Sequence, residues 1–98
     1  MKATPIVIEP AAEQDIYQAI DFYEQKSRGA AKHFRDDLVA VIETILFFPR
    51  AAAIAFGNIR LKPMRRFPYV IGYVLLEEVV HVIGVQHGGL GWDAFKMP

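Results

Sequence analysis

The densest group of side chains able to do chemistry is basic. Arg60, Lys62, Arg65 and Arg66 place four cations within seven residues. Arg60 and Lys62 are two apart, so on a strand they share a face. Such cations can hold phosphate groups or pair with acidic side chains of a partner. The structural alternative is a solvated strand edge, where basic side chains oppose edge-to-edge association, and the pattern alone leaves both interpretations open.

Two tyrosines follow this basic cluster. Tyr69 and Tyr73 are expected on one face of the next strand, together with Phe67 and Ile71. Beside arginines, a tyrosine could stack on a base or donate a proton. We predict that both instead pack against the core with their hydroxyl groups at its rim, which is the commoner use of such residues.

The three histidines are weaker candidates. His81 and His87 share a face if the last strand is regular, and histidine is the natural general base near neutral pH. No spaced carboxylate or second ligand accompanies either one, so no metal site is expected. His33 follows the pattern of a surface residue on a helix. We interpret all three as structural.

Other chemical signatures are missing from the sequence. It has no cysteine, which excludes disulfides and thiol nucleophiles. It has no phosphate loop, nucleophile elbow or dinucleotide fingerprint, so no cofactor is expected.

Composition predicts a single domain over residues 1–98, since 53% of the residues are hydrophobic and the chain is too short for a second core. Eleven basic and eleven acidic residues cancel, which leaves no overall field to attract nucleic acid. Neither a signal peptide nor a membrane-spanning run is recognisable, so we expect a cytoplasmic protein without membrane contact.

Hydrophobic periodicity predicts an α+β domain. A short strand over Pro5–Glu9 precedes helices over Ala11–Gln25 and from Ala30 to Phe47 or Phe48, which form an antiparallel hairpin across a four-residue break. A loop over Arg50–Asn58 follows. Strands are then predicted over the ranges Ile59–Met64, Phe67–Leu76 and Val79–Gln86. The order is β-α-α-β-β-β.

This order predicts a helical hairpin on one face of a small twisted antiparallel sheet. The long strands are apolar on both faces, so we expect the other face to remain exposed as an interaction surface. Glu77-Glu78 would form a hairpin tip, although the pair suits a type I′ turn poorly. The tail from His87 is glycine-rich, and Trp92 is predicted to fold back as an apolar anchor.

Several short stretches in fixed order resemble the ParE/RelE superfamily, whose members are often called plasmid-stabilisation proteins. The most specific stretch is the phenylalanine-proline-tyrosine strand start, followed by a strand that ends in histidine. The residues that carry the resemblance are Ala12, Asp15-Ile16, Phe22-Tyr23-Glu24, Gly29, Ala30, Phe34, Ile42, Ile45, Pro49, Ile59-Arg60, Arg66-Phe67-Pro68-Tyr69, Ile71-Gly72-Tyr73, Val82 to His87 and Trp92.

The resemblance implies a toxin of a type II toxin–antitoxin system, neutralised by a cognate antitoxin that covers apolar and basic surface. RelE-like members cleave messenger RNA in the ribosome, whereas ParE-like members inhibit DNA gyrase. This sequence has Gly88-Gly89-Leu90 where many relatives carry arginine, and it has no tyrosine after Tyr73. Because losing a positioned cation is costly in phosphoryl chemistry, the ParE-like branch is favoured.

The expected target- or antitoxin-binding residues are Arg60, Lys62, Arg65, Arg66, Tyr69 and Tyr73. On this interpretation the protein is a non-enzymatic inhibitor. One alternative is a RelE-like ribosome-dependent mRNA endoribonuclease that uses Arg60, Lys62 and Arg66, with His87 as the candidate base. The other is a non-toxic relative that only binds a partner. Either a homodimer or a heteromeric complex would fit the expected apolar face.

Overall fold

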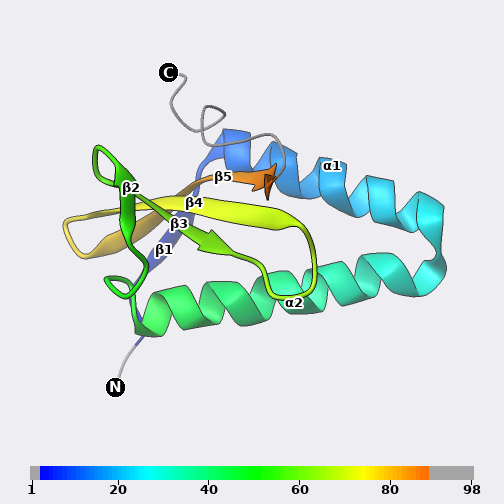
Figure 1. Ribbon diagram of the computed structural model, residues 1–98, viewed down its shortest axis with the longest axis horizontal. Helices are drawn as coiled ribbons and strands as arrows, with labels where there is room; N and C mark the ends of the chain where they lie inside the picture. Colours follow the sequence, from blue (N-terminus) through cyan, green and yellow to red (C-terminus); the bar gives the residue numbers. More distant parts are fainter. Residues whose placement is uncertain (1–2, 89–98) are drawn as a thin grey trace.

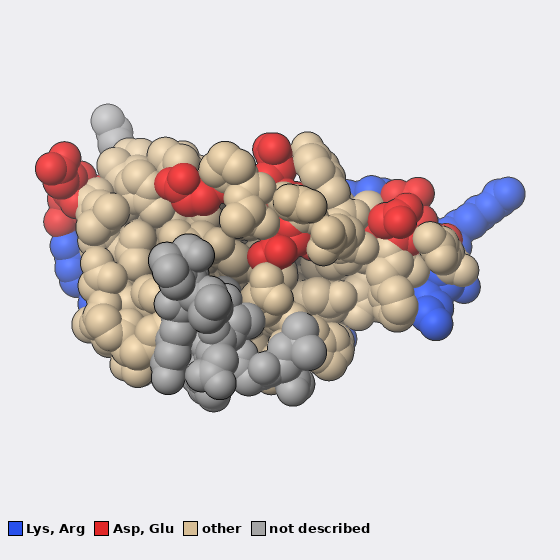
Figure 2. All heavy atoms as spheres, turned by 90° about the horizontal axis from the view of Figure 1, so that it is seen from above, with Lys and Arg blue, Asp and Glu red and all other residues tan. Residues whose placement is uncertain are grey.

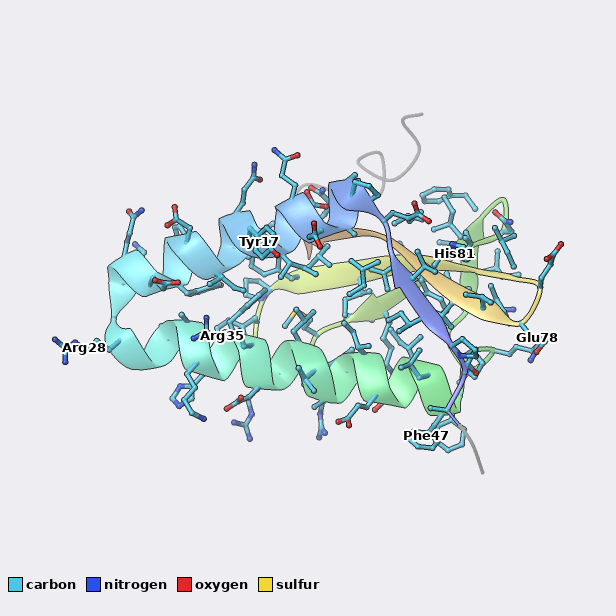
Figure 3. The ribbon with its side chains drawn as sticks, turned by 180° about the vertical axis from the view of Figure 1, so that it is seen from behind. Tyr17, Arg28, Arg35, Phe47, Glu78 and His81 are labelled. Carbon is cyan, nitrogen blue, oxygen red and sulfur yellow. The ribbon has the colours of Figure 1, made fainter. Side chains whose placement is uncertain are left out.

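The computed structural model describes residues 3–88, which form two helices and five strands. In chain order these are β1 (Ile6–Ile8), α1 (Pro10–Lys26), α2 (Arg28–Phe47), β2 (Ile54–Phe56), β3 (Ile59–Pro63), β4 (Tyr69–Leu76) and β5 (Val79–His87). The helices lie side by side on one face of the sheet (Figures 1 and 3), which confirms the α+β prediction. The predictions for Gly89, Leu90 and Trp92 fall outside the described residues.

The two helices begin and end close to the predicted residues. Pro10 occupies the first turn of α1, where its missing N–H is no loss, and Glu13 lies near the positive end of the helix dipole. The predicted four-residue break is shorter in the structure. Ser27 alone separates the helices, because its side chain caps α2 by accepting a hydrogen bond from the Ala30 N–H at 3.1 Å. Gly29 therefore lies inside α2.

The sheet is mixed rather than wholly antiparallel, with strand order β1-β5-β4-β3-β2. The pairs β3–β4 and β4–β5 are antiparallel as predicted, β2 adds a further antiparallel pair with β3, and β1 runs parallel to β5 at the edge. Parallel pairing needs a long crossover, and the α1–α2 hairpin together with the following strands supplies one. The sequence pattern does not encode which edge β1 joins.

The segment predicted as a loop over Arg50–Asn58 contains the short strand β2, so that prediction was wrong in part. Gly57 has φ of 57° and, with Asn58, turns the chain into β3. At the other hairpin, Glu77 and Glu78 form the predicted tip between β4 and β5. Both adopt the positive φ that a type I′ turn requires, at 49° and 63°, despite being poorly suited to it.

The core lies between the helices and the sheet. Phe34 and Val41 of α2 pack there with Ile71 and Tyr73 of β4 and Val82 of β5. The register shifts between Gly72 and Tyr73, which pair with Gly84 and Val82 and leave Ile83 as an extra residue in β5.

The face of the sheet away from the helices is less exposed than predicted. Leu61 and Val74 on this face are each only 9% exposed. Gly72 and Gly84 oppose each other at its centre, so little apolar side chain is present there. The exposed large hydrophobic residues of the described sheet lie at its edges and tip instead: Val7, Ile8, Ile54 and Leu76.

Candidate functional site

Arg60 points to the end of α2 rather than to solvent. Its Nη1 donates hydrogen bonds to the carbonyl oxygens of Ala52 at 2.6 Å and Arg50 at 3.2 Å. Arg60 pairs with Tyr73 on β4, and the prediction that Arg60 and Lys62 share a face agrees with the register. That face is the helix-covered one, so the side chain reaches along the rim of the core and anchors the segment after α2.

Tyr73 anchors the same segment from the central strand. Its side chain is completely buried, and its hydroxyl donates to the Pro49 carbonyl oxygen at 2.8 Å. Burial raises the pKa of this phenol, and the nearby charge of Arg60 opposes that shift. The packing interpretation is therefore the correct one for Tyr73, which presents no surface to a partner. We call Pro49, Arg50, Ala52, Arg60 and Tyr73 the anchored end.

Lys62 lies two residues further along β3, opposite Ile71, and is half-buried. Within the described residues its ammonium group makes no hydrogen bond or ion pair. It lies between Arg60 and the turn that leads from β3 to β4.

Arg65 and Arg66 occupy the turn between β3 and β4, and both are exposed. The Arg66 backbone N–H donates to Asp37 Oδ2 at 3.0 Å, which holds the turn against α2. The two arginines line a surface cleft of about 430 Å³ together with His33, Asp36, Asp37 and Ala40 of α2. We call Arg65 and Arg66 the basic turn.

The structure thus divides the basic cluster. The anchored end lies just beyond Phe47, the last residue of α2, whereas the basic turn meets α2 at Asp37. Ten helical positions separate Asp37 from Phe47, or about 15 Å at 1.5 Å per residue. Arg60 and the basic turn therefore do not converge on one ligand the size of a phosphate group.

Tyr69 belongs to an aromatic cluster at the other end of β4. Its ring centroid lies 5.4 Å from that of Phe34, 6.2 Å from that of Tyr23 and 5.5 Å from that of His87. Tyr69 is half-buried, so part of it is accessible from outside. Burial, and then the neighbouring Tyr69, raises the pKa of Tyr23.

His87 lies far from Arg60. It pairs with Tyr69, four residues along β4 from the Tyr73 that faces Arg60, so the two are about 13 Å apart along the strand direction alone. The four residues expected for an RNA-cleaving site, Arg60, Lys62, Arg66 and His87, are not gathered around one point.

The two strand histidines lie on opposite faces, because β5 is not regular and a shared face was expected only for a regular strand. The extra residue Ile83 reverses the alternation, so His81 pairs with Val74 and His87 pairs with Tyr69. His81 Nδ1 is 3.0 Å from Glu9 Oε2, which joins β5 to the residue before α1. His33 lies on the surface of α2 as expected, at the cleft beside the basic turn.

Two aspartates make long-range contacts that were not predicted from the sequence. Asp37, only 7% exposed, holds the basic turn. Asp15 Oδ2 accepts hydrogen bonds from the Val85 N–H at 3.0 Å and the Gln86 side chain at 2.8 Å, beyond the point where β1 stops covering the edge of β5. For both aspartates, the only sign of such a contact in the sequence is a polar side chain close to the predicted apolar stripe of its helix.

The described residues contain no group of three or more histidine, aspartate or glutamate side chains that could hold a metal ion. Within residues 3–88 neither helix has both the length and the apolar character to cross a membrane.

Comparison with known proteins connects this geometry to a family. Eight chains among the solved structures match. One of them, described as "Chromosomal ParDE TA system from P. aeruginosa", superposes with a TM-score of 0.76 at 12% identity, covering 87% of this chain and 96% of that chain. At that identity the match shows the shared fold. No curated protein sequence matches.

The family model described as "ParE toxin of type II toxin-antitoxin system, parDE" matches residues 6–90, which include both helices, all five strands and the basic cluster. This chain belongs to the ParE toxin family.

Proposed function

We propose that this chain is the toxin of a type II pair, that it inhibits a protein target such as DNA gyrase in the cytoplasm, and that a cognate antitoxin neutralises it. The proposal builds on the ParE family match. The observation that carries it is the basic turn, where two exposed arginines border a cleft on α2. Exposed arginines are frequent anchors in protein interfaces, because the guanidinium group binds carboxylates with two parallel hydrogen bonds.

An inhibitor that binds a protein fits this site better than a ribonuclease does. RNA cleavage requires cations and a base placed around one phosphate group. Here Arg60 already binds backbone carbonyls, and His87 lies on another part of the sheet. The cleft also contains Asp36 and Asp37, whose charge would repel a phosphate but would suit a partner of mixed charge.

The test is induction of the chain alone in a bacterial host, followed by colony counting. The wild type should reduce survival, and the double variant Arg65→Ala/Arg66→Ala should restore most of it. The matched control is Arg28→Ala/Arg35→Ala, which removes the same charge from α2 at exposed positions that point to solvent (Figure 3) and should remain toxic. Equal rescue by both variants would mean that net charge, not the basic turn, determines toxicity.

The target is tested with the purified wild type. Inhibition of supercoiling by DNA gyrase, without cleavage of messenger RNA on ribosomes, is the expected result. Cleavage of messenger RNA would support the RelE-like alternative. A folded chain that neither reduces survival nor inhibits gyrase would instead be a non-toxic partner-binding relative. Co-expression of a short reading frame encoded beside this gene should restore growth if it encodes the antitoxin.

A further inference from the structure

A second recess lies between α1 and the end of β5, on a different part of the surface from the basic turn. Its volume is about 220 Å³. Its lining includes Asp15, Gln18 and Phe22 of α1, together with Tyr69, Gln86 and His87 of the sheet. Carboxylate, amide and aromatic groups therefore converge on one small space.

Asp15 has unused acceptor capacity in this recess. Its two hydrogen bonds, from the Val85 N–H and the Gln86 side chain, both end on Oδ2. A carboxylate provides about four acceptor positions, so Oδ1 is able to accept from a ligand while Oδ2 holds the strand. Because Oδ2 is fixed to β5, the charge is held in place before any ligand arrives.

The aromatic walls suit a cation. Phe22 is 49% exposed and Tyr69 is half-buried, so both rings offer surface to a ligand. Phe22 already accommodates a cation within the chain, since Lys26 Nζ lies 4.9 Å from its ring centroid. The negative face of such a ring attracts ammonium and guanidinium groups.

The surrounding charge has the matching sign. Among the described residues that line the recess there is no lysine or arginine. α1 carries four acidic residues against one lysine: Glu13, Asp15, Asp21 and Glu24 against Lys26. In Figure 2, seen from above, Asp and Glu rather than Lys or Arg colour the middle of the face, and the basic side chains gather toward the ends. A cationic group would be attracted to this region, and a phosphate would be repelled.

We infer that this recess receives an arginine side chain of the antitoxin, an inference that rests on the proposed function for the identity of the partner. Arginine fits better than lysine because its planar guanidinium group can stack on Phe22 or Tyr69 while its N–H groups bind a carboxylate. Asp15 Oδ1 would accept the charged hydrogen bond, and the side-chain oxygens of Gln18 and Gln86, which also line the recess, are further acceptors. One buried arginine of this kind is a typical interface anchor.

The inference is tested with the whole chain and a small probe, by titrating acetyl-Gly-Arg-Gly-amide into ¹⁵N-labelled protein. Saturable shifts are expected in the backbone amide of Val85 and the side-chain amides of Gln18 and Gln86. Replacing arginine by the neutral isostere citrulline should weaken binding about tenfold, because the charged hydrogen bond is lost. Equal binding of both peptides, or tighter binding of the tryptophan peptide acetyl-Gly-Trp-Gly-amide at the same resonances, would overturn the inference.

Variants titrated with the same peptides test the location of the site. Phe22→Leu should weaken arginine binding about fivefold through loss of the cation–π contact. Phe48→Leu is the matched control, because Phe48 is a similarly exposed aromatic residue, at 61%, outside the recess. Asp15→Asn should abolish the preference for arginine over citrulline, with its amide spectrum checked for an intact fold. Retention of that preference in Asp15→Asn would contradict the assignment.

This experiment is separate from the toxicity test. If the arginine peptide leaves the recess resonances unchanged while the neighbouring frame still rescues growth, the arginine inference fails and the proposed function stands. If the arginine peptide binds as expected but the folded chain does not reduce survival, the recess is supported as an arginine site and the proposed function fails.

Discussion

At the anchored end, the Arg60 guanidinium is turned toward the protein and binds two backbone carbonyls, close to the buried hydroxyl of Tyr73. At the basic turn, Arg65 and Arg66 are exposed, and the contact with α2 comes from a backbone N–H rather than from a guanidinium. Residues of one type, a few positions apart in the sequence, therefore serve different purposes. A basic cluster in a sequence need not form one surface in the fold.

The largest expected effect is at the anchored end. Tyr73→Ala should lower the free energy of unfolding by about 3–5 kcal/mol, because it removes a fully buried ring and leaves a cavity. Chemical denaturation followed by circular dichroism measures this change. The control is Tyr17→Ala, since Tyr17 is 63% exposed and its loss should change stability by only about 0.5 kcal/mol. Similar losses of unfolding free energy in both variants would contradict the anchoring role assigned to Tyr73.

Arg60→Met should have the next largest effect, about 1.5–3 kcal/mol, because two carbonyl oxygens lose a charged donor while the aliphatic part of the side chain is kept. Denaturant titration of the variant gives the value. The comparison variant is Arg65→Met, which should be nearly neutral in stability. If Arg65→Met were the more destabilising of the two, the assignment of anchoring and exposed roles would be reversed.

The protein should also become less stable at alkaline pH, because Tyr73 of the anchored end ionises there. Burial raises the pKa of Tyr73 above its usual value near 10, so the unfolded chain loses this proton first. The stabilising contribution is complete below pH 10 and is lost as the pH rises through the higher folded pKa. The slope for this group is at most about 1.4 kcal/mol per pH unit.

Tyr73→Phe isolates that contribution. It should flatten the decline above pH 10 relative to the wild type, and part of the decline should persist because the pKa of Tyr23 is also raised by burial. Denaturation midpoints measured between pH 8 and pH 11 would check the slope. An unchanged slope in Tyr73→Phe would show that other groups control the alkaline dependence.

Local patterns were enough to predict the two helices and the antiparallel strands β3, β4 and β5, but not the short strand β2. The apolar stripes of α1 and α2 and the alternation in β3 depend on neighbouring residues, which the sequence displays directly. The parallel edge strand β1 and the extra residue Ile83 depend on pairing between distant segments. A single inserted residue reversed the face of His87 relative to His81, which periodicity within one strand does not reveal.

The site was predictable only as a set of residue types. Arg60, Arg65 and Arg66 were identified as neighbours in sequence, but the carbonyl oxygens that bind Arg60 belong to a segment whose position depends on where α2 ends. Asp37 and Asp15 were missed as anchors because their partners are backbone groups 29 and 70 residues away. Such contacts become visible only once the chain is folded.

The smallest expected effect on stability is at the basic turn. Arg65→Ala/Arg66→Ala should change the free energy of unfolding by about 0.5 kcal/mol at most, since both side chains are exposed. The bond to Asp37 should survive, because alanine retains the backbone N–H that Arg66 donates. Denaturant titration of this double variant, beside the survival assay, separates loss of function from loss of fold. A large loss of stability would mean that the guanidinium groups also hold the turn against α2, and the contrast with the anchored end would then disappear.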